Sequence, residues 1–199
     1  MYQALRASRS EFVPVRNLNY HVRVWGQQSG SVAPLVLVHG WMDVAASWQF
    51  VVDAMRDERW IIAPDWRGFG HTRLEGPAVD SYWFPDYMAD LDALLDHYAG
   101  ERKVDLVGHS MGGNIAMMYA GVRPQRIEHL VNLEGFGMPE TRPAQAPGRY
   151  AQWMDEIKTV QRGGKALKSY ADADGVASRL MKTNPRLAQD KADWLARQW

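Results

Sequence analysis

The stretch that decides the fold runs Lys103-Val-Asp-Leu-Val-Gly-His-Ser-Met-Gly-Gly-Asn-Ile-Ala-Met-Met-Tyr-Ala120. It predicts a short apolar strand, then a serine between glycines, then an apolar helix. Gly108 and Gly112 stand two residues before and two residues after Ser110, which removes the Cβ atoms that would clash in a very sharp turn from strand to helix. This pattern is typical of a nucleophile elbow, and the flanking strand and helix are the context that the motif requires. The alternative is a glycine-rich turn into a buried helix, without chemistry.

The composition indicates one globular domain with room for an inserted subdomain. The chain has 199 residues, of which 46% are hydrophobic and 11% aromatic, so it can bury a sizeable core. Basic and acidic residues number 23 each, and no overall field attracts nucleic acid or an anionic membrane. The absence of cysteine excludes disulfides and cysteine-based catalysis. We therefore expect neither nucleic acid nor membrane as a partner.

The first ten residues contain no apolar core of the kind found in secretory signals. No apolar run approaches the roughly 20 residues that span a bilayer. A cytoplasmic location is the default expectation.

Before the elbow, the chain alternates between predicted strands and helices. Residues 12–15 and 20–25 alternate at period two and predict a hairpin with one wet face. Residues 35–38 are apolar throughout, which predicts a central parallel strand covered on both faces, and residues 60–63 predict the next strand. Two helices are expected around these strands: Ser47 would cap a helix that carries Trp48, Val51, Val52 and Met55 on one face, and Pro85 would begin a helix that Gly100 ends.

After the elbow, residues 127–133 predict one more strand, which ends at Glu134. The alternation predicts an α/β fold for residues 1–137, with a mostly parallel, doubly wound sheet. From residue 138 the pattern changes, because Pro139, Pro143 and Pro147 mark a polar linker and only helical periodicity follows. We expect residues 138–199 to form an incomplete helical cap whose apolar stripes lie on an apolar surface. The stripes comprise Tyr150, Trp153, Met154, Ile157 and Val160, then Leu180 and Met181, then Leu187, Trp194, Leu195 and Trp199.

Three motifs, each after a predicted buried strand, resemble the α/β-hydrolase superfamily over about residues 11–137. They read His39-Gly40-Trp41, then Asp65-Trp-Arg67-Gly68-Phe-Gly70-His-Thr72, then Gly108-His-Ser-Met-Gly112-Gly113. The second motif looks most like the branch that holds haloalkane dehalogenases, epoxide hydrolases and small ester, lactone or carbon–carbon bond hydrolases. In that branch a helical cap follows the sixth strand, so the resemblance implies the same order here.

The resemblance implies that Ser110 is a nucleophile and that the amides of Trp41 and Met111 donate to an oxyanion. A serine hydroxyl is a weak nucleophile, so a histidine must take its proton and a carboxylate must orient that histidine. Dehalogenases and epoxide hydrolases of this branch carry an aspartate at the elbow, and Ser110 therefore favours acyl chemistry. No cofactor and no metal is implied.

Other polar residues receive weaker assignments. His39 is expected to shape the oxyanion turn, and the candidates for the substrate pocket are His39, Trp41, His109 and Trp153. Asp65 and Arg67 are expected to tie loops together rather than to contact substrate. Four further histidines, on a strand, a loop or a packing helix, are expected at the surface, namely His21, His71, His97 and His129.

The sequence departs from the superfamily after the sixth strand. It has no histidine after His129 and no strand pattern after Leu133, whereas the superfamily takes its histidine from a loop after the eighth strand. The chain is then either a fragment of a longer hydrolase, which we favour, or a degenerate member that has lost its base. In either case we expect the chain alone to be inactive. Glu134 is a candidate acid because some relatives take it from this position, although its carboxylate also fits a purely local role.

The leading hypothesis is a serine hydrolase that cleaves a fairly apolar small-molecule ester, lactone or related carbonyl compound through an acyl-enzyme. One alternative is a hydrolase-like ligand-binding or sensor protein with little turnover. A lower alternative is a carbon–carbon bond hydrolase or lyase on the same fold. The oligomeric state stays open.

Overall fold

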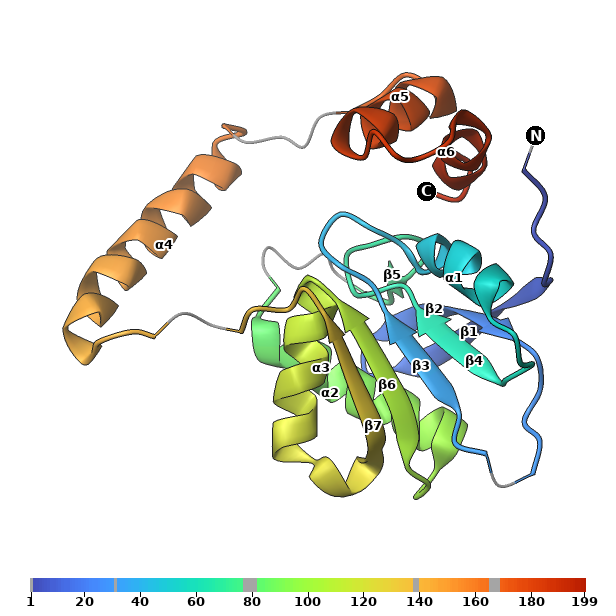
Figure 1. The fold of residues 1–199 in the computed structure, drawn as a ribbon. Coiled ribbons are helices and arrows are strands. Elements are labelled where there is room, and N and C mark those ends of the chain that lie inside the picture. The colour runs from blue at the N-terminus through green and yellow to red at the C-terminus, as the bar shows by residue number, and fades with distance from the viewer. Residues whose placement is uncertain (1, 31, 77–81, 138–139, 165–168) are drawn as a thin grey trace.

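The computed structural model describes all residues except 1, 31, 77–81, 138–139 and 165–168. Within these residues the strands are β1 Ser8–Val15, β2 Leu18–Trp25, β3 Leu35–Val38, β4 Ile61–Pro64, β5 Arg73–Leu74, β6 Val104–His109 and β7 Ile127–Leu133. They form one sheet in the order β1-β2-β4-β3-β6-β7, with β5 paired to β2 (Figure 1). The neighbours from β4 to β7 are parallel, while β1 and β2 pair antiparallel at one edge. The predicted α/β fold is confirmed.

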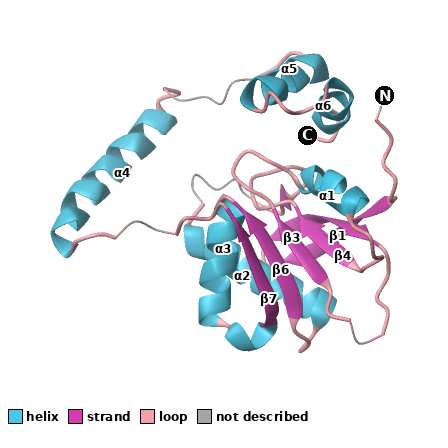
Figure 2. Ribbon diagram, in the orientation of Figure 1, coloured by secondary structure: helices cyan, strands magenta, loops and turns pink. Residues whose placement is uncertain are grey.

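The described helices are η1 Ala45–Trp48, α1 Gln49–Ala54, α2 Phe84–Ala99, α3 Met111–Val122, η2 Pro124–Arg126, η3 Pro143–Gln145, α4 Ala146–Gln161, α5 Ala173–Thr183 and α6 Gln189–Ala196. Of these, α1 covers one face of the sheet, and α2 and α3 cover the other (Figure 2). All four side chains of β3 are buried, with Val36 and Val38 in the core cluster of α2 and α3 and Leu35 and Leu37 in that of α1. This division explains why β3 is apolar throughout.

The start of the first helix differs from the prediction. Ser47 lies inside the 3₁₀ turn η1 and does not cap a helix, because its hydroxyl donates to the carboxylate of Asp43. The α-helix begins only at Gln49, and Met55 follows its last residue.

The predicted polar linker is shorter than expected. Pro143 begins η3 and Pro147 lies in the first turn of α4, where the missing N–H of proline costs nothing. Pro139 lies outside the described residues.

The helices after residue 140 fall into two groups. Leu195 of α6 is buried against Val44 and Ala46, and Trp194 packs edge-on against Phe50. The α5–α6 pair therefore docks on the end of the sheet that carries η1 and α1. By contrast, α4 has no buried residue and extends away from the sheet (Figure 1). The expectation that the α4 stripe lies on an apolar surface is wrong in this structure, and Trp153 is 54% exposed.

The strand β7 lies at the second edge of the sheet. In the part of the chain that the structure describes, it pairs only with β6. Its burial is also low, with Leu130 37%, Val131 45% and Leu133 42% exposed. The strand β7 thus exposes both unpaired backbone groups and apolar side chains to solvent.

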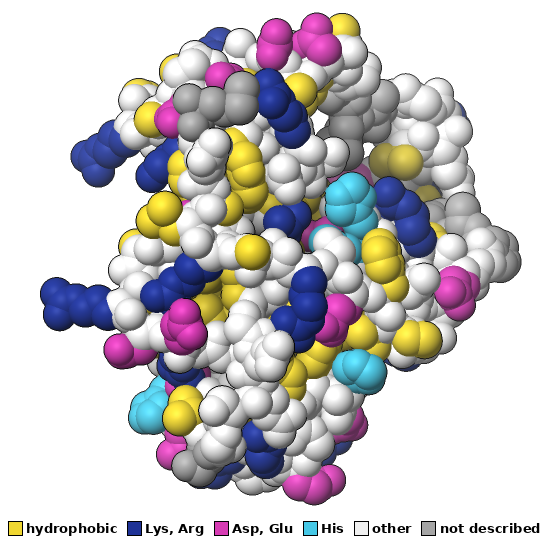
Figure 3. Space-filling view, turned by 90° about the vertical axis from the view of Figure 1, so that its right-hand side faces the viewer, with side chains coloured by type: hydrophobic (Ala, Val, Ile, Leu, Met, Phe, Trp, Pro, Cys, Tyr) yellow, Lys and Arg dark blue, Asp and Glu magenta, His cyan; other side chains and the backbone are white. Residues whose placement is uncertain are grey.

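The surface carries mixed charge. Basic and acidic side chains alternate over the face shown in Figure 3, with apolar side chains between them. Among the described helices, none has the length and apolar character required to cross a membrane.

Candidate active site

Ser110 occupies a strained turn between β6 and α3. Its backbone has φ 52° and ψ −116°, which a residue with a side chain rarely adopts. Its amide donates to Leu133 O at 2.8 Å, which fixes the turn against the end of β7. A Cβ on Gly112 would overlap the carbonyl oxygen of Val38, and one on Gly108 would overlap that of Gly112. The glycines are therefore required by close backbone approach.

Backbone strain gathers where the parallel strands end. The described non-glycine residues with positive φ are Arg16, Met42, Ser110 and Glu134. Ser110 and Glu134 directly follow β6 and β7, and Met42 lies in the turn after β3. Such strain is costly and concentrates at functional sites. In open α/β sheets, ligands bind at this carboxyl edge.

The turn after β3 brings His39, Gly40 and Trp41 beside the elbow. A Cβ on Gly40 would lie 3.1 Å from Ser110 Cβ and 3.1 Å from His109 Nδ1, so a side chain here would crowd the elbow, and glycine lets the two turns approach without a shift. The chain segment that carries the Trp41 amide thus passes directly beside the Ser110 side chain.

The ring of His39 is buried and holds this turn. Its Nε2 accepts from the amide of Trp66 at 2.9 Å, so the proton lies on Nδ1, which donates to Gly40 O at 2.8 Å. Burial lowers the pKa of His39, in agreement with a neutral ring. Both ring nitrogens therefore have hydrogen-bond partners, and His39 holds the turn after β3 in place.

Asp65 lies at the centre of a buried hydrogen-bond network. Its carboxylate accepts from His21 Nδ1 at 2.7 Å, from the His71 amide at 2.9 Å and from the Ala45 amide at 2.7 Å. Burial alone would raise the pKa of Asp65, but these hydrogen bonds outweigh it and hold the pKa below its ordinary value. The far nitrogen of His21 lies 2.9 Å from Ser10 Oγ. Asp65 therefore joins the hairpin, the turn η1 and its own loop.

The expectation that His21 lies at the surface is wrong. Its side chain is 2% exposed and belongs to the chain Ser10–His21–Asp65. The period-two alternation placed His21 on a strand. It did not show that Asp65 would cover the side of the strand on which His21 lies, since the two residues are 44 positions apart in the sequence.

Arg67 forms a second buried network. Its guanidinium makes two bonds to Asp90, at 2.6 and 2.8 Å, and its amide donates to Tyr20 OH at 3.0 Å. The hydroxyl of Tyr20 in turn donates to Asp90 at 2.8 Å. These bonds tie the loop of Arg67 to α2 and β2.

Gly68 and Gly70 shape the same loop, and both have positive φ. A Cβ on Gly70 would overlap the carboxylate of Asp65. Between them, Phe69 packs edge-on against the ring of Trp41, with centroids 5.4 Å apart. The loop thereby supports the Trp41 turn.

The base of a triad is not among the partners of Ser110. In the described structure, which includes all six histidines, no hydrogen bond joins a histidine to the Ser110 hydroxyl. The acid–histidine pair at the elbow is His109 Nε2 with Glu134, at 3.7 Å, with the His109 side chain half-buried and the Glu134 side chain exposed. Ser110 and Glu134 follow adjacent strands, and no described hydrogen bond links the two side chains through a histidine.

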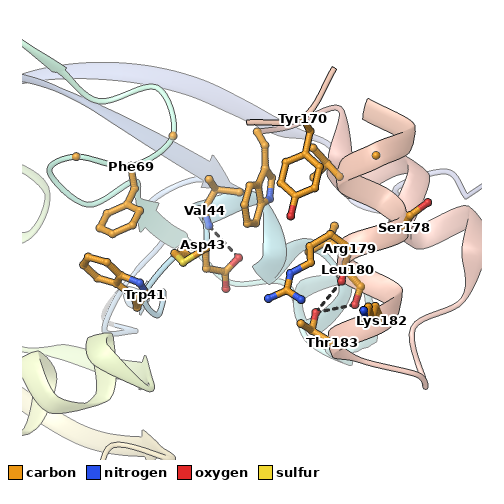
Figure 4. A pocket seen from close by; sticks show the side chains of 16 residues that line it. Trp41, Asp43, Val44, Phe69, Tyr170, Ser178, Arg179, Leu180, Lys182 and Thr183 are labelled. Carbon is orange, nitrogen blue, oxygen red and sulfur yellow. Dashed lines mark hydrogen bonds between the residues drawn. The ribbon is translucent and has the colours of Figure 1, made fainter. Parts of the chain in front are cut away.

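A cavity of about 1010 Å³ opens beside the Trp41 turn (Figure 4). Its apolar wall includes Trp41, Val44, Phe69, Val176, Leu180 and Trp199. It lies between the turns after β3 and β4 and helix α5. Among the predicted pocket residues Trp41 lines this cavity, whereas His39, His109 and Trp153 do not. The contribution of α5 was not predicted, because its periodicity indicated only packing.

Comparison with known proteins decides the family. The profile described as alpha/beta hydrolase fold matches residues 33–192, which include all three motifs. The chain belongs to the α/β-hydrolase fold family. A solved thioesterase domain from the curacin biosynthetic pathway superposes with a TM-score of 0.79 at 24% identity, covering 96% of this chain and 65% of that one, which shows the shared fold.

Two curated relatives show how similar the sequences are. A serine hydrolase-like protein of Danio rerio is 28% identical over 96% of this chain and 58% of its own length. A cis-3-alkyl-4-alkyloxetan-2-one decarboxylase of Shewanella oneidensis is 36% identical over 76% of this chain and 48% of its own length. The chain thus spans about half the length of the curated relatives it matches.

Proposed function

We propose that the protein is a serine hydrolase that cleaves a carboxylic ester, lactone or related carbonyl compound through an acyl-enzyme on Ser110. The observation that carries the proposal is the strained elbow of Ser110 at the carboxyl edge of the sheet, directly beside Gly40 and Trp41. A nucleophile held there presents its hydroxyl above the sheet.

The oxyanion would be stabilised by two amides. Met111 is the first residue of α3, so its N–H points out of a helix N-terminus, where the helix dipole favours negative charge. The Trp41 amide follows the glycine that touches the elbow. Each such donor contributes about 3 kcal/mol to the transition state.

The acid and the base are the open parts of the mechanism. Glu134 remains the candidate acid, since its backbone is strained and it directly follows β7. No described histidine forms a hydrogen bond with the Ser110 hydroxyl, so none is in place to take its proton. We infer that these 199 residues alone lack catalytic competence.

The test is labelling of the full-length protein by a fluorophosphonate, with the labelled peptide mapped by mass spectrometry. Ser110→Ala should abolish labelling, because the reagent phosphonylates an activated serine. Ser10→Ala is the matched control, since Ser10 lies at hydrogen-bond distance from His21, which is in turn bonded to Asp65, whereas no described histidine is bonded to Ser110. Labelling that survives Ser110→Ala and disappears with Ser10→Ala would overturn the proposal.

A second candidate is a lyase that acts on a four-membered lactone. It is favoured by the similarity to the oxetanone decarboxylase, whose name gives a cyclic ester as its substrate. A cis-dialkyl oxetan-2-one distinguishes the two, because hydrolysis gives a hydroxy acid whereas decarboxylation releases carbon dioxide. Binding without either product would identify a sensor.

A further inference from the structure

The cavity beside Trp41 has an uncompensated positive charge. Arg179 and Lys182 line it from α5, three residues apart and hence on one side of that helix. Within the described residues, neither side chain has a hydrogen-bond or ion-pair partner. Among the described residues that line the cavity, Asp43 is the acidic one, so their side chains carry two positive charges against one negative.

The carboxylate of Asp43 is already engaged in its own turn. It accepts from the Val44 amide at 2.9 Å and from the hydroxyl of Ser47. Figure 4 shows Arg179 reaching from α5 toward the Asp43 segment, with Trp41 and Phe69 on the opposite wall. The free cation therefore faces a space whose other walls are mostly apolar.

A ligand that matches both the positive charge and the apolar walls of the cavity has an apolar body and one anionic group. The planar guanidinium of arginine matches carboxylate and phosphate with two parallel hydrogen bonds. The volume of the cavity is at the upper end of the range for small-molecule sites. A neutral ligand would bury the apolar wall but would leave Arg179 covered and unpaired.

We propose that this cavity binds an anionic amphiphile, with its carboxylate or phosphate on Arg179 and Lys182 and its apolar part against Trp41 and Phe69. Because Trp41 follows the glycine beside Ser110, the bound molecule would reach toward the elbow. Resting on the proposed function, the substrate is then an acyl compound that carries a second, anionic group.

Calorimetric titration tests the site without chemistry. The full-length protein with Ser110→Ala is titrated with octanoate, octyl phosphate and octanol, which share one chain length and differ in the head group. We expect at least one anion to bind about tenfold or more tightly than octanol. Arg179→Gln should remove that preference, whereas Arg186→Gln, an exposed arginine outside the cavity, should leave it intact.

Each outcome decides the proposal. Preference for octanoate alone identifies a carboxylate site, and preference for octyl phosphate alone identifies a phosphate site. Equal binding of all three compounds, or equal effects of the two arginine substitutions, overturns the proposal. If labelling of Ser110 fails while the anion preference holds, only the hydrolase function falls.

Discussion

Asp65 is the residue on which the described hydrogen bonds around the site depend most. It accepts from three segments and is 2% exposed, so removing its charge leaves buried donors without a full partner. Asp65→Asn should lower the free energy of unfolding by about 3 kcal/mol at neutral pH. Urea unfolding measures this, with Asp57→Asn at an exposed carboxylate as the control.

The same residue sets a pH dependence. Because folding depresses the pKa of Asp65, its stabilisation is complete above the unfolded value of about 3.9 and is lost as the pH falls through the lower folded value. The difference between the wild type and Asp65→Asn should therefore shrink below about pH 4. A difference that stays constant into acid would show that the charge of Asp65 does not stabilise the fold.

Some site residues were predictable and others were not. The glycines around Ser110 specify a local turn, and the family resemblance carried by the three motifs implied that Trp41, Ser110 and Met111 belong to one site. Two other features depend on the packing of elements that are distant in the sequence. They are the hydrogen bond between His21 and Asp65 and the position of Arg179 in the wall of the cavity. No spacing in the sequence records either contact.

Among the elements, β7 is the most exposed part of the sheet. Its open edge and its exposed apolar side chains form a template for pairing with another chain. We expect the 199-residue chain to associate with rising concentration and Val131→Lys to weaken that association. Sedimentation velocity measures it, with Val160→Lys on α4 as the control for added charge. A wild-type chain that stays monomeric would contradict this expectation.

The helix α4 shows what periodicity predicts. The stripe of Tyr150, Trp153 and Val160 indicated a helix, and the helix is present. All three side chains are exposed, because amphipathicity indicates a preferred face but not the presence of a surface to cover it. In α6 the same kind of pattern does meet a partner, since Leu195 packs against Val44.

At the scale of the whole molecule, the strained turns gather at one edge of the sheet, where the proposed function places the reaction. The strained residues Met42, Ser110 and Glu134 follow three strands, and the cavity under α5 opens beside the Trp41 turn. The networks of Asp65 and Arg67 hold the intervening loops to the hairpin and to α2. This arrangement agrees with a scaffold that holds a nucleophile rigidly and leaves substrate choice to the helices after β7.

The central claim is that Ser110 forms an acyl-enzyme. The most direct measurement mixes the full-length protein with a p-nitrophenyl ester, quenches at successive times and maps the acylated peptide by mass spectrometry. We predict an adduct on Ser110 that forms with the first burst of nitrophenol, decays at the rate of turnover and is absent in Ser110→Ala. Turnover with no adduct at any time, or an adduct on another residue, would contradict the claim.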